Sequence, residues 1–386
     1  MSKDFYSFLV NTKIIYGIGA ADQLGEIVTK KGARKVMLIA DTGVKKAGLV
    51  EKIQDNLQAS NIEYSLFEDI EISSSTDTVD RGARLVKEEK CDLIVAIGGG
   101  SSIDTAKAIG VMVTNEGKCI DYAGSDKVKN PPMEVIALPT TAGTSAEITD
   151  VAVIADRASK ARIGIRSPYI VSSIAILDPL LTITMPPHIT ASTGMDALSH
   201  AIESYTNTYT KAPTEVLALE AIRLIGENIS HAVANGNNLE ARDNMLMGSL
   251  LAGISFLNTR LGILHAITGP FCGHYEVPHG VANSVLLPYV MEYNLKGNFD
   301  KFADIASVLG YPTEILTRRE AAQASVDAIR DLLDDVGLPA SFKEMNLDKK
   351  QIPEIASKAM KSGNIAINPR VPTKEDLIEI CEKSFQ

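Results

Sequence analysis

IVAIGGGSSIDTAK, at residues 94–107, reads as a buried strand, a glycine turn and the first turns of a helix. Consecutive glycines allow the backbone to approach a pyrophosphate closely, and the helix that follows presents free N–H groups and a partial positive charge to it. Because any tight strand-to-helix turn can use glycine, this segment alone is weak evidence. The predicted nucleotide contacts in it are Gly98, Gly99, Gly100, Ser101 and Asp104.

Two neighbouring segments strengthen the prediction of a dinucleotide site. A second strand, Val135 to Leu138, runs into a segment that carries Thr140, Thr141, Thr144 and Ser145. Hydroxyl groups at the carboxyl end of a strand lie at the usual ligand edge of an open sheet. Asp41 follows the strand Val36 to Ala40, where a carboxylate accepts hydrogen bonds from a ribose and repels a 2′-phosphate, which favours NAD over NADP. The alternative is that Asp41 only forms a turn.

The hydrophobic pattern predicts two domains of different classes. Between Tyr16 and about Leu181, short β-branched runs alternate with helical patterns, which is typical of a parallel sheet covered by helices. After Met185-Pro186-Pro187, long amphipathic stretches replace the strands, and a proline pair suits a domain boundary. We therefore expect an α/β domain over residues 1–184 and an all-α domain over residues 185–386. The further predicted strands are Leu93 to Ile97 and Ile174 to Leu177; the predicted helices are Ser192 to Tyr205, Thr214 to Ala234, Leu239 to Asn258 and Glu320 to Val336.

Composition excludes several other classes of protein. A chain of 386 residues exceeds the size of one hydrophobic core, which supports two domains. The net charge is −10 and no stripe of Lys and Arg is present, so a nucleic-acid partner is not expected. Apolar runs are too short for a membrane span. The four cysteines form no C-x-x-C pair, which favours a reducing, cytoplasmic compartment.

The second half contains a candidate metal site. Asp196 and His200 are four residues apart, on one face of a predicted helix, and His265 and His279 flank a segment rich in glycine and proline that we expect to be a loop. One carboxylate with imidazoles suits Zn(II) or Fe(II) and leaves a coordination position open for a substrate oxygen. A single histidine is more often structural, as we expect for His188 and His231, but the clustering favours a metal.

The glycine turn and the candidate metal site occur together in one family of enzymes. The chain resembles the iron-containing (group III) alcohol dehydrogenases over nearly its whole length. The most specific segments are GGGSSID at 98–104, PTTAGT at 139–144, TGMDALSHAIE at 193–203 and PHGVAN at 278–283. The resemblance implies a Rossmann-like N-terminal domain, an all-helical C-terminal domain, a homodimer and NAD as cofactor. It further implies a divalent metal, Fe(II) before Zn(II) or Mn(II), on Asp196, His200, His265 and His279. The cofactor contacts it implies are Asp41, Gly98, Gly99, Ser101, Thr140, Thr141, Thr144 and Leu181.

Three departures from the family pattern bear on catalysis. Gly269 stands where many members carry a histidine near the nicotinamide; either His274 takes over its proton-relay role or the relay runs through water. Arg260 replaces a glycine or another small residue. Arg162 matches a family lysine near the cofactor phosphates, and guanidinium geometry differs from that of ammonium.

These observations predict an oxidoreductase that interconverts a short alcohol and its aldehyde by metal-assisted hydride transfer to or from NAD(H). A guanidinium beside a metal favours an anionic aldehyde, such as sulfoacetaldehyde or a semialdehyde, if Arg260 faces the substrate. If Arg260 instead pairs with an acidic residue of the fold, a neutral alcohol or diol is expected. The alternatives of other classes are a dehydroquinate synthase-like lyase and a non-enzymatic nucleotide-binding protein.

Overall fold

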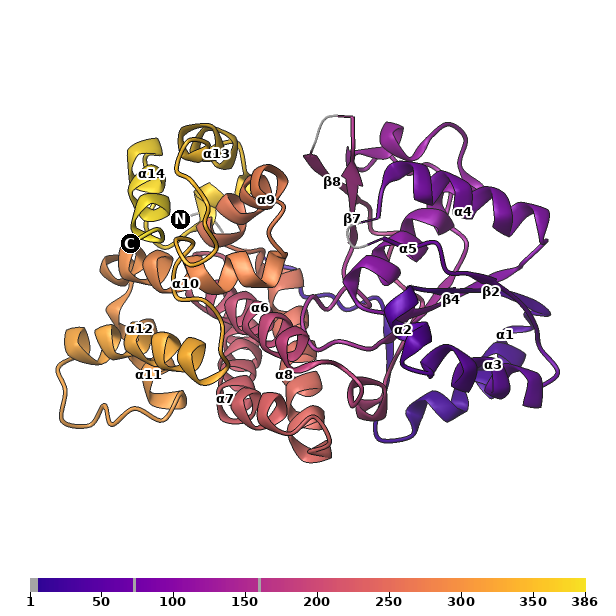
Figure 1. Cartoon of the computed structure of the whole chain (residues 1–386), viewed down its shortest axis with the longest axis horizontal. Coiled ribbons are helices and arrows are strands. Elements are labelled where there is room, and N and C mark those ends of the chain that lie inside the picture. Colours follow the sequence, from indigo (N-terminus) through magenta and orange to yellow (C-terminus); the bar gives the residue numbers. More distant parts are fainter. Residues whose placement is uncertain (1–5, 72–73, 159–160) are drawn as a thin grey trace. The chain divides into compact units, whose positions relative to one another are not determined.

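The structure is a computed structural model that describes residues 6–71, 74–158 and 161–386 (Figure 1). Its chain divides into two compact units. One consists of residues 11–185, and the other of residues 186–386 together with residues 6–10. Residues 6–10 belong to the helical unit because Leu9 exchanges backbone hydrogen bonds with the side chain of Asn258, at 2.6 and 3.1 Å. The sequence had assigned them to the α/β domain.

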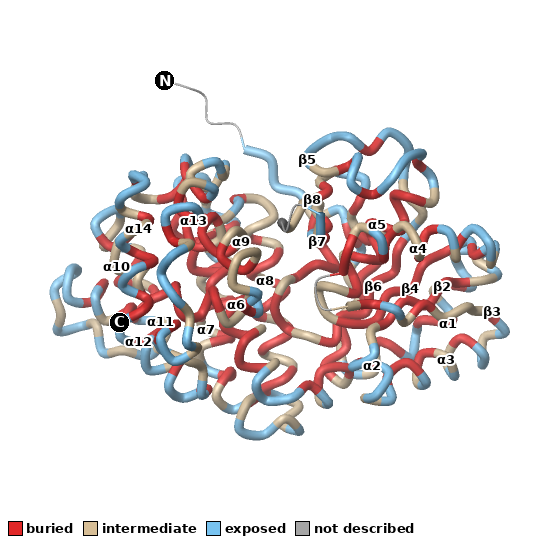
Figure 2. The backbone as a smooth tube through the Cα atoms, turned by 45° about the horizontal axis from the view of Figure 1, so that its top comes forward, coloured by how far each residue is buried: buried red, intermediate tan, exposed pale blue. Residues whose placement is uncertain are grey.

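The first unit is built on a six-stranded parallel sheet in the order β1-β9-β6-β4-β2-β3. Every residue of β4 and β6 is buried, as are five of the six residues of β2 (Figure 2). Such burial on both faces is possible because these strands are nearly all apolar. The four strands predicted from the sequence are confirmed as members of this sheet. The strands are β1 Lys13–Tyr16, β2 Lys35–Ala40, β3 Glu63–Phe67, β4 Leu93–Gly98, β6 Val135–Pro139 and β9 Ile174–Leu177.

Helices cover the two faces of this sheet with two separate apolar cores. Residues of α4 and α5 pack on one face, and residues of α1, α2 and α3 pack on the other (Figure 1). A second, three-stranded sheet in the order β5-β8-β7 was not predicted. These elements are α1 Leu24–Lys31, α2 Thr42–Lys46, α3 Leu49–Ala59, α4 Thr76–Glu88, α5 Gly100–Thr114, β5 Gly124–Ser125, β7 Val151–Asp156 and β8 Ala161–Arg166, with 3-10 turns at Ala20–Gln23, Cys119–Tyr122 and Pro179–Thr182.

The strand order places a switch point between β2 and β4. The chain leaves β2 toward β3 on one side, and it continues after β4 toward β6 on the other side. The helices that follow these two strands therefore lie on opposite faces. Open α/β sheets bind ligands at the carboxyl ends of strands at such a point. The candidate nucleotide residues Asp41 and Gly98 to Gly100 occupy this position.

The second unit contains helices, turns and connecting loops but no strand among its described residues, and the four helices predicted from the sequence are confirmed in it. Pro187 occupies the first turn of α6, where its missing N–H costs nothing. One expectation is wrong: the segment between His265 and His279 is mostly helix α9, with Pro270 inside it, and not a loop. The helices are α6 Pro187–Thr206, α7 Ala212–Ala234, α8 Leu239–Thr259, α9 Ile263–Tyr275, α10 His279–Asn294, α11 Phe299–Val308, α12 Arg318–Asp335, α13 Ile352–Ala359 and α14 Lys374–Lys383, with 3-10 turns at Leu295–Gly297 and Gly363–Ile367.

Within the described residues, no single helix is both long and apolar enough to cross a membrane. Only α8 and α9 taken together reach that length and composition, and they meet at a bend of 102°.

Candidate functional site

The predicted nucleotide loops lie against each other at the carboxyl edge of the sheet. The backbone N–H of Thr140, after β6, donates to the carbonyl of Gly98, at the end of β4, over 3.0 Å. A Cβ added to Gly99 would lie 3.2 Å from Thr141, and one added to Gly100 would lie 2.7 Å from the Thr144 hydroxyl. The glycine turn and the threonine segment therefore pack closely, and a side chain at position 100 would require Thr144 to move.

Asp41 follows β2, and the hydrogen bonds of its carboxylate connect this end of the strand to the helix after the glycine turn. Its Oδ1 accepts hydrogen bonds from the N–H groups of Gly43 and Val44, at 2.8 and 3.0 Å, and so caps α2. Its Oδ2 accepts a hydrogen bond of 3.0 Å from Ser102 on α5. The turn-forming role considered from the sequence is thus present, and the carboxylate also lies beside Gly98, where a ribose contact was predicted. That contact stays a prediction.

The remaining predicted cofactor residues differ in their surroundings. Asp104 accepts a hydrogen bond of 3.0 Å from the Val153 N–H and lies 3.6 Å from the Lys107 ammonium, while burial raises its pKa. These contacts give Asp104 a role in holding β7. Leu181 is only 1% exposed and packs in the sheet core, so its side chain is covered by protein. Arg162 lies half-buried on β8, and Ser145 adopts a left-handed φ of 51°.

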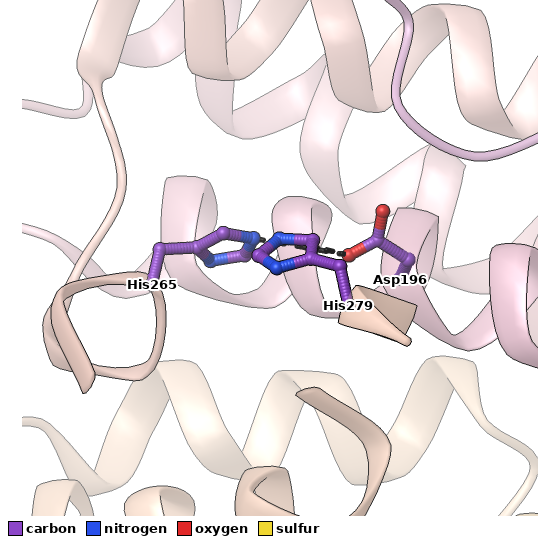
Figure 3. Close-up of side chains that lie close together, drawn as sticks. All are labelled: Asp196, His265 and His279. Atoms are coloured by element: carbon purple, nitrogen blue, oxygen red, sulfur yellow. Dashed lines mark ion pairs between the residues drawn. The ribbon is translucent and has the colours of Figure 1, made fainter. Parts of the chain in front are cut away.

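Three of the four predicted metal ligands converge in the helical unit (Figure 3). The Nε2 atoms of His265, on α9, and His279, at the start of α10, lie 3.9 and 3.8 Å from Oδ1 of Asp196 on α6. The side chains of Asp196 and His265 are 3% and 9% exposed, but that of His279 is 27% exposed. The cluster is therefore closed on the α6 side and more accessible at His279.

His200 lies beside this cluster without being one of its three converging groups. Its ring stacks on that of His265, with centroids 4.5 Å apart, and on Phe256, at 4.7 Å. Burial alone would raise the pKa of Asp196, but the imidazoles of His200, His279 and His265 hold it below its ordinary value. Asp196 is thus an anion next to three imidazoles, and this donor set fits a borderline divalent cation.

Glu203 orients His265, a role that the sequence reasoning missed. Its Oε2 lies 2.7 Å from Nδ1 of His265, and its Oε1 accepts a hydrogen bond of 2.7 Å from the Leu264 N–H. A carboxylate on Nδ1 favours the tautomer that leaves Nε2 with a lone pair for a cation. The available signal was spacing: Glu203 is seven residues after Asp196, so both side chains lie on one face of α6.

Asn283 connects all three converging groups. Its Nδ2 donates to Oδ1 of Asp196 over 2.6 Å and lies 3.1 and 3.2 Å from Nε2 of His265 and His279. Its Oδ1 in turn accepts a hydrogen bond of 2.6 Å from the Thr268 hydroxyl. The amide thus points its donor group at the lone pairs that would hold a cation.

His274 is not brought to this cluster. Its Nε2 lies 3.0 Å from the Lys358 ammonium and 3.4 Å from a carboxylate oxygen of Glu354, and both partners are on α13. Gly269, in contrast, is one helical turn after His265, and a Cβ added there would meet open space. The predicted relay role of His274 receives no support from these contacts.

Arg260 ends α8 in a conformation that favours glycine, with φ 69° and ψ −172°. Its N–H donates to the Phe256 carbonyl over 2.8 Å, and its carbonyl accepts from the Asn207 amide over 2.9 Å. The side chain is exposed and forms no ion pair or hydrogen bond with any residue in the described ranges. Within those ranges, the acidic partner considered as an alternative is therefore absent.

Each of the two units matches a separate model of a known protein family. Residues 11–179 match the model of iron-containing alcohol dehydrogenase, and residues 190–385 match that of the Fe-containing alcohol dehydrogenase family, C-terminal. The 1,3-propanediol dehydrogenase of Citrobacter freundii is 39% identical over 387 residues, which is 100% of both chains. A crystal structure of 1,3-propanediol oxidoreductase has a TM-score of 0.96 at 38% identity and covers 99% of this chain and 100% of that one. The sulfoacetaldehyde reductase of Bifidobacterium kashiwanohense, solved with NAD+, has a TM-score of 0.89 at 29% identity, covering 98% of each chain.

The chain belongs to the iron-containing alcohol dehydrogenase family. It is an oxidoreductase that interconverts alcohols and aldehydes, and membership implies a nicotinamide cofactor and a metal.

Proposed function

We propose that the chain interconverts a short primary alcohol and its aldehyde with NAD(H) and a divalent cation, Fe(II) in first place. The observation that carries this proposal is the convergence of Asp196, His265 and His279 around one point. When bound there, a cation supplies Lewis acidity, which lowers the pKa of an alcohol and polarises an aldehyde carbonyl. His200, stacked on His265, is the proposed fourth ligand.

Residues of the chain position the metal ligands and provide the binding groups for NAD(H). Glu203 fixes the tautomer of His265, and Asn283 holds the Asp196 carboxylate by a hydrogen bond of 2.6 Å. The glycine turn and the threonine segment supply backbone N–H groups and hydroxyls for the NAD(H) pyrophosphate. We propose that the alcohol proton leaves through water, because the partners of His274 are Lys358 and Glu354.

We propose further that the substrate carries an anionic group that binds Arg260. Holding a non-glycine residue at this φ and ψ costs about 1–3 kcal/mol, so the arginine is retained against a penalty. The bend that contains it leads directly into α9, where His265 is five residues later. A guanidinium in this position offers a planar fork for a sulfonate or carboxylate. The sulfoacetaldehyde reductase among the similar structures makes a short sulfonated or carboxylated aldehyde a reasonable substrate.

The competing substrate class is a neutral alcohol or diol, as the name of the 1,3-propanediol relatives suggests. We would follow NADH oxidation by the Fe(II)-loaded enzyme with propanal, 3-hydroxypropanal, sulfoacetaldehyde and succinic semialdehyde. An anionic preference in kcat/KM above about 100-fold, or about 2.7 kcal/mol, is expected, and the Arg260→Gly variant should lose it.

The same substitution separates recognition from stability. Arg260→Gly should raise the unfolding free energy by about 1 kcal/mol or more, because glycine adopts this conformation without strain. Lys90→Gly is the matched control, since Lys90 has a left-handed φ of 53° in the other unit and should change stability without changing substrate preference. A wild-type enzyme that prefers 3-hydroxypropanal, with no change in Arg260→Gly, would assign the chain to neutral substrates.

Cellular setting and assembly extend this proposal. We propose a reducing compartment, the cytoplasm, because the four cysteines are buried and form no disulfide with one another. We also propose a homodimer, which size-exclusion chromatography with light scattering would test.

A further inference from the structure

Lys107 is a fully buried cation for which the proposed reaction has no use. It lies on α5, two turns after the glycine turn, and is 1% exposed. Its ammonium donates to the carbonyls of Ala146, Thr149 and Val151, at 2.9, 2.9 and 2.6 Å, and to the Thr149 hydroxyl at 3.0 Å. An ammonium group has only three N–H donors, so these four oxygens saturate it.

The acceptors of Lys107 belong to the segment that continues the predicted threonine contacts. Residues 140–150 form no helix or strand, yet Ala146 to Thr149 are all buried. Buried carbonyls outside regular structure need donors from elsewhere in the protein. Lys107 supplies such donors to Ala146 and Thr149. Its ammonium group is surrounded by carbonyl oxygens in the way that a bound metal cation would be.

Two further residues on the same face of α5 also contact the segment after β6. Gly100 lies against Thr144, with room for no Cβ, and Asp104 accepts from the Val153 N–H over 3.0 Å. Gly100, Asp104 and Lys107 are spaced by four and three residues and so share a helix face. The helix therefore holds the chain from Thr144 to Val153 at three successive turns.

Burying an ammonium carries a cost that the surroundings offset only in part. Burial lowers the pKa of Lys107, and the carboxylate of Asp104, at 3.6 Å, counters this effect. An apolar side chain would avoid the desolvation cost but would leave the Ala146 and Thr149 carbonyls without these donors. Lys107 thus fixes one conformation of residues 140–149. An apolar residue at this position could make the fold more stable, but it would not hold this conformation.

We propose that Lys107 is a positioning residue for NAD(H). It sets the conformation of residues 140–149, so that Thr140, Thr141 and Thr144 face the dinucleotide beside the glycine turn. This inference rests on the proposed function, because it takes NAD(H) as the ligand of the two loops. Lys107 does not touch the cofactor, and its effect acts through the backbone of the threonine segment.

The test compares two buried polar networks on the same helix in the metal-loaded, full-length enzyme. Lys107→Met removes the ammonium at nearly constant volume. Asn115→Ala is the matched control, because Asn115 ends α5 and ties its far end to the Asn130 backbone through hydrogen bonds of 2.9 and 3.0 Å. Thr149→Val removes one acceptor of Lys107 and serves where Lys107→Met does not fold.

The readouts are the NADH dissociation constant from fluorescence titration, kcat at saturating NADH, and metal content. We expect Lys107→Met to raise the dissociation constant at least 10-fold and Thr149→Val about 3-fold, with kcat and metal content within 2-fold of wild type. Asn115→Ala should lower the unfolding temperature and leave the dissociation constant unchanged. The inference would be overturned if folded Lys107→Met or Thr149→Val had an NADH dissociation constant within 2-fold of wild type. It would also be overturned if Asn115→Ala raised this dissociation constant as much as Lys107→Met does. Wild-type enzyme that does not bind NADH would instead overturn the proposed function and this inference with it.

Discussion

At the scale of single residues, Glu203 decides whether His265 can act as a metal ligand. In Glu203→Gln, the amide N–H would donate to Nδ1 and leave the proton on Nε2, the atom that faces Asp196. We expect metal affinity to fall about 10- to 100-fold, as measured by titration with buffered Zn(II) or anaerobic Fe(II). Glu227→Gln, which loses only an exposed ion pair with Arg223, is the control. Unchanged affinity in Glu203→Gln would remove the tautomer role.

A second residue-scale prediction concerns Glu147, whose pKa burial raises to about 7, against the opposing effect of Lys107. Because the folded protein holds this proton more tightly than the unfolded chain, the contribution to stability is complete below about pH 4.5 and is lost as pH rises to 7. The loss amounts to roughly 3 kcal/mol. Urea denaturation between pH 5 and pH 8 should therefore show Glu147→Gln gaining stability relative to wild type.

The control for Glu147→Gln is Glu344→Gln, which changes an exposed carboxylate in the other unit. Its unfolding free energy should follow that of wild type across the same pH range. If Glu147→Gln also runs parallel to wild type, Glu147 is ionised in the folded protein at neutral pH.

At the scale of elements, glycines within helices have opposite expected effects according to the space around them. Gly269, inside α9, has nothing within reach of an added Cβ, so Gly269→Ala should raise the unfolding free energy by about 0.5–1 kcal/mol. Gly110, inside α5, would place its Cβ 2.7 Å from the backbone carbonyl oxygen of Met133, which cannot move aside as a flexible side chain can. Gly110→Ala should therefore destabilise the protein, by about 1–3 kcal/mol. Thermal unfolding of both variants in chelator distinguishes the two cases.

The helix α9 shows where reading the sequence failed. Gly269, Pro270 and Gly273 all disfavour helix, and together they predicted a loop between the two histidines. The helix forms because its other residues are largely apolar and Ile263, Leu264, Ile267 and Phe271 are fully buried in the helical unit. Tertiary burial outweighs local propensity here, as it commonly does for helices in proteins.

At the scale of the whole molecule, metal binding should stabilise one unit specifically. A cation at 100 times its dissociation constant adds about 2.7 kcal/mol to the stability of the state that binds it. We expect hydrogen exchange to slow in α6, α9 and α10, which hold the three converging side chains, when Fe(II) or Zn(II) is added to chelator-treated protein. Asp196→Ala should show no such protection. Equal protection in that variant would place the cation elsewhere.

The sequence by itself determined the two classes of fold and most of the chemistry. Short β-branched runs that alternate with helical patterns are typical of buried parallel strands, and the glycine turn indicates a dinucleotide site when it is read together with the threonine segment and Asp41. Likewise, the spacing of Asp196 and His200 places both on one face of α6 regardless of context. These are local constraints, which periodicity and residue type express directly.

Only the tertiary structure decided which residues support that chemistry. Glu203, Asn283 and Lys107 have ordinary places in the sequence, and their roles come mainly from distant partners: His265 is 62 residues from Glu203, Asp196 is 87 residues from Asn283, and Ala146 is 39 residues from Lys107. The tertiary structure also paired His274 with α13 and left Arg260 strained at a helix end. Hydrogen bonding between distant segments depends on how helices pack, and no local pattern encodes it.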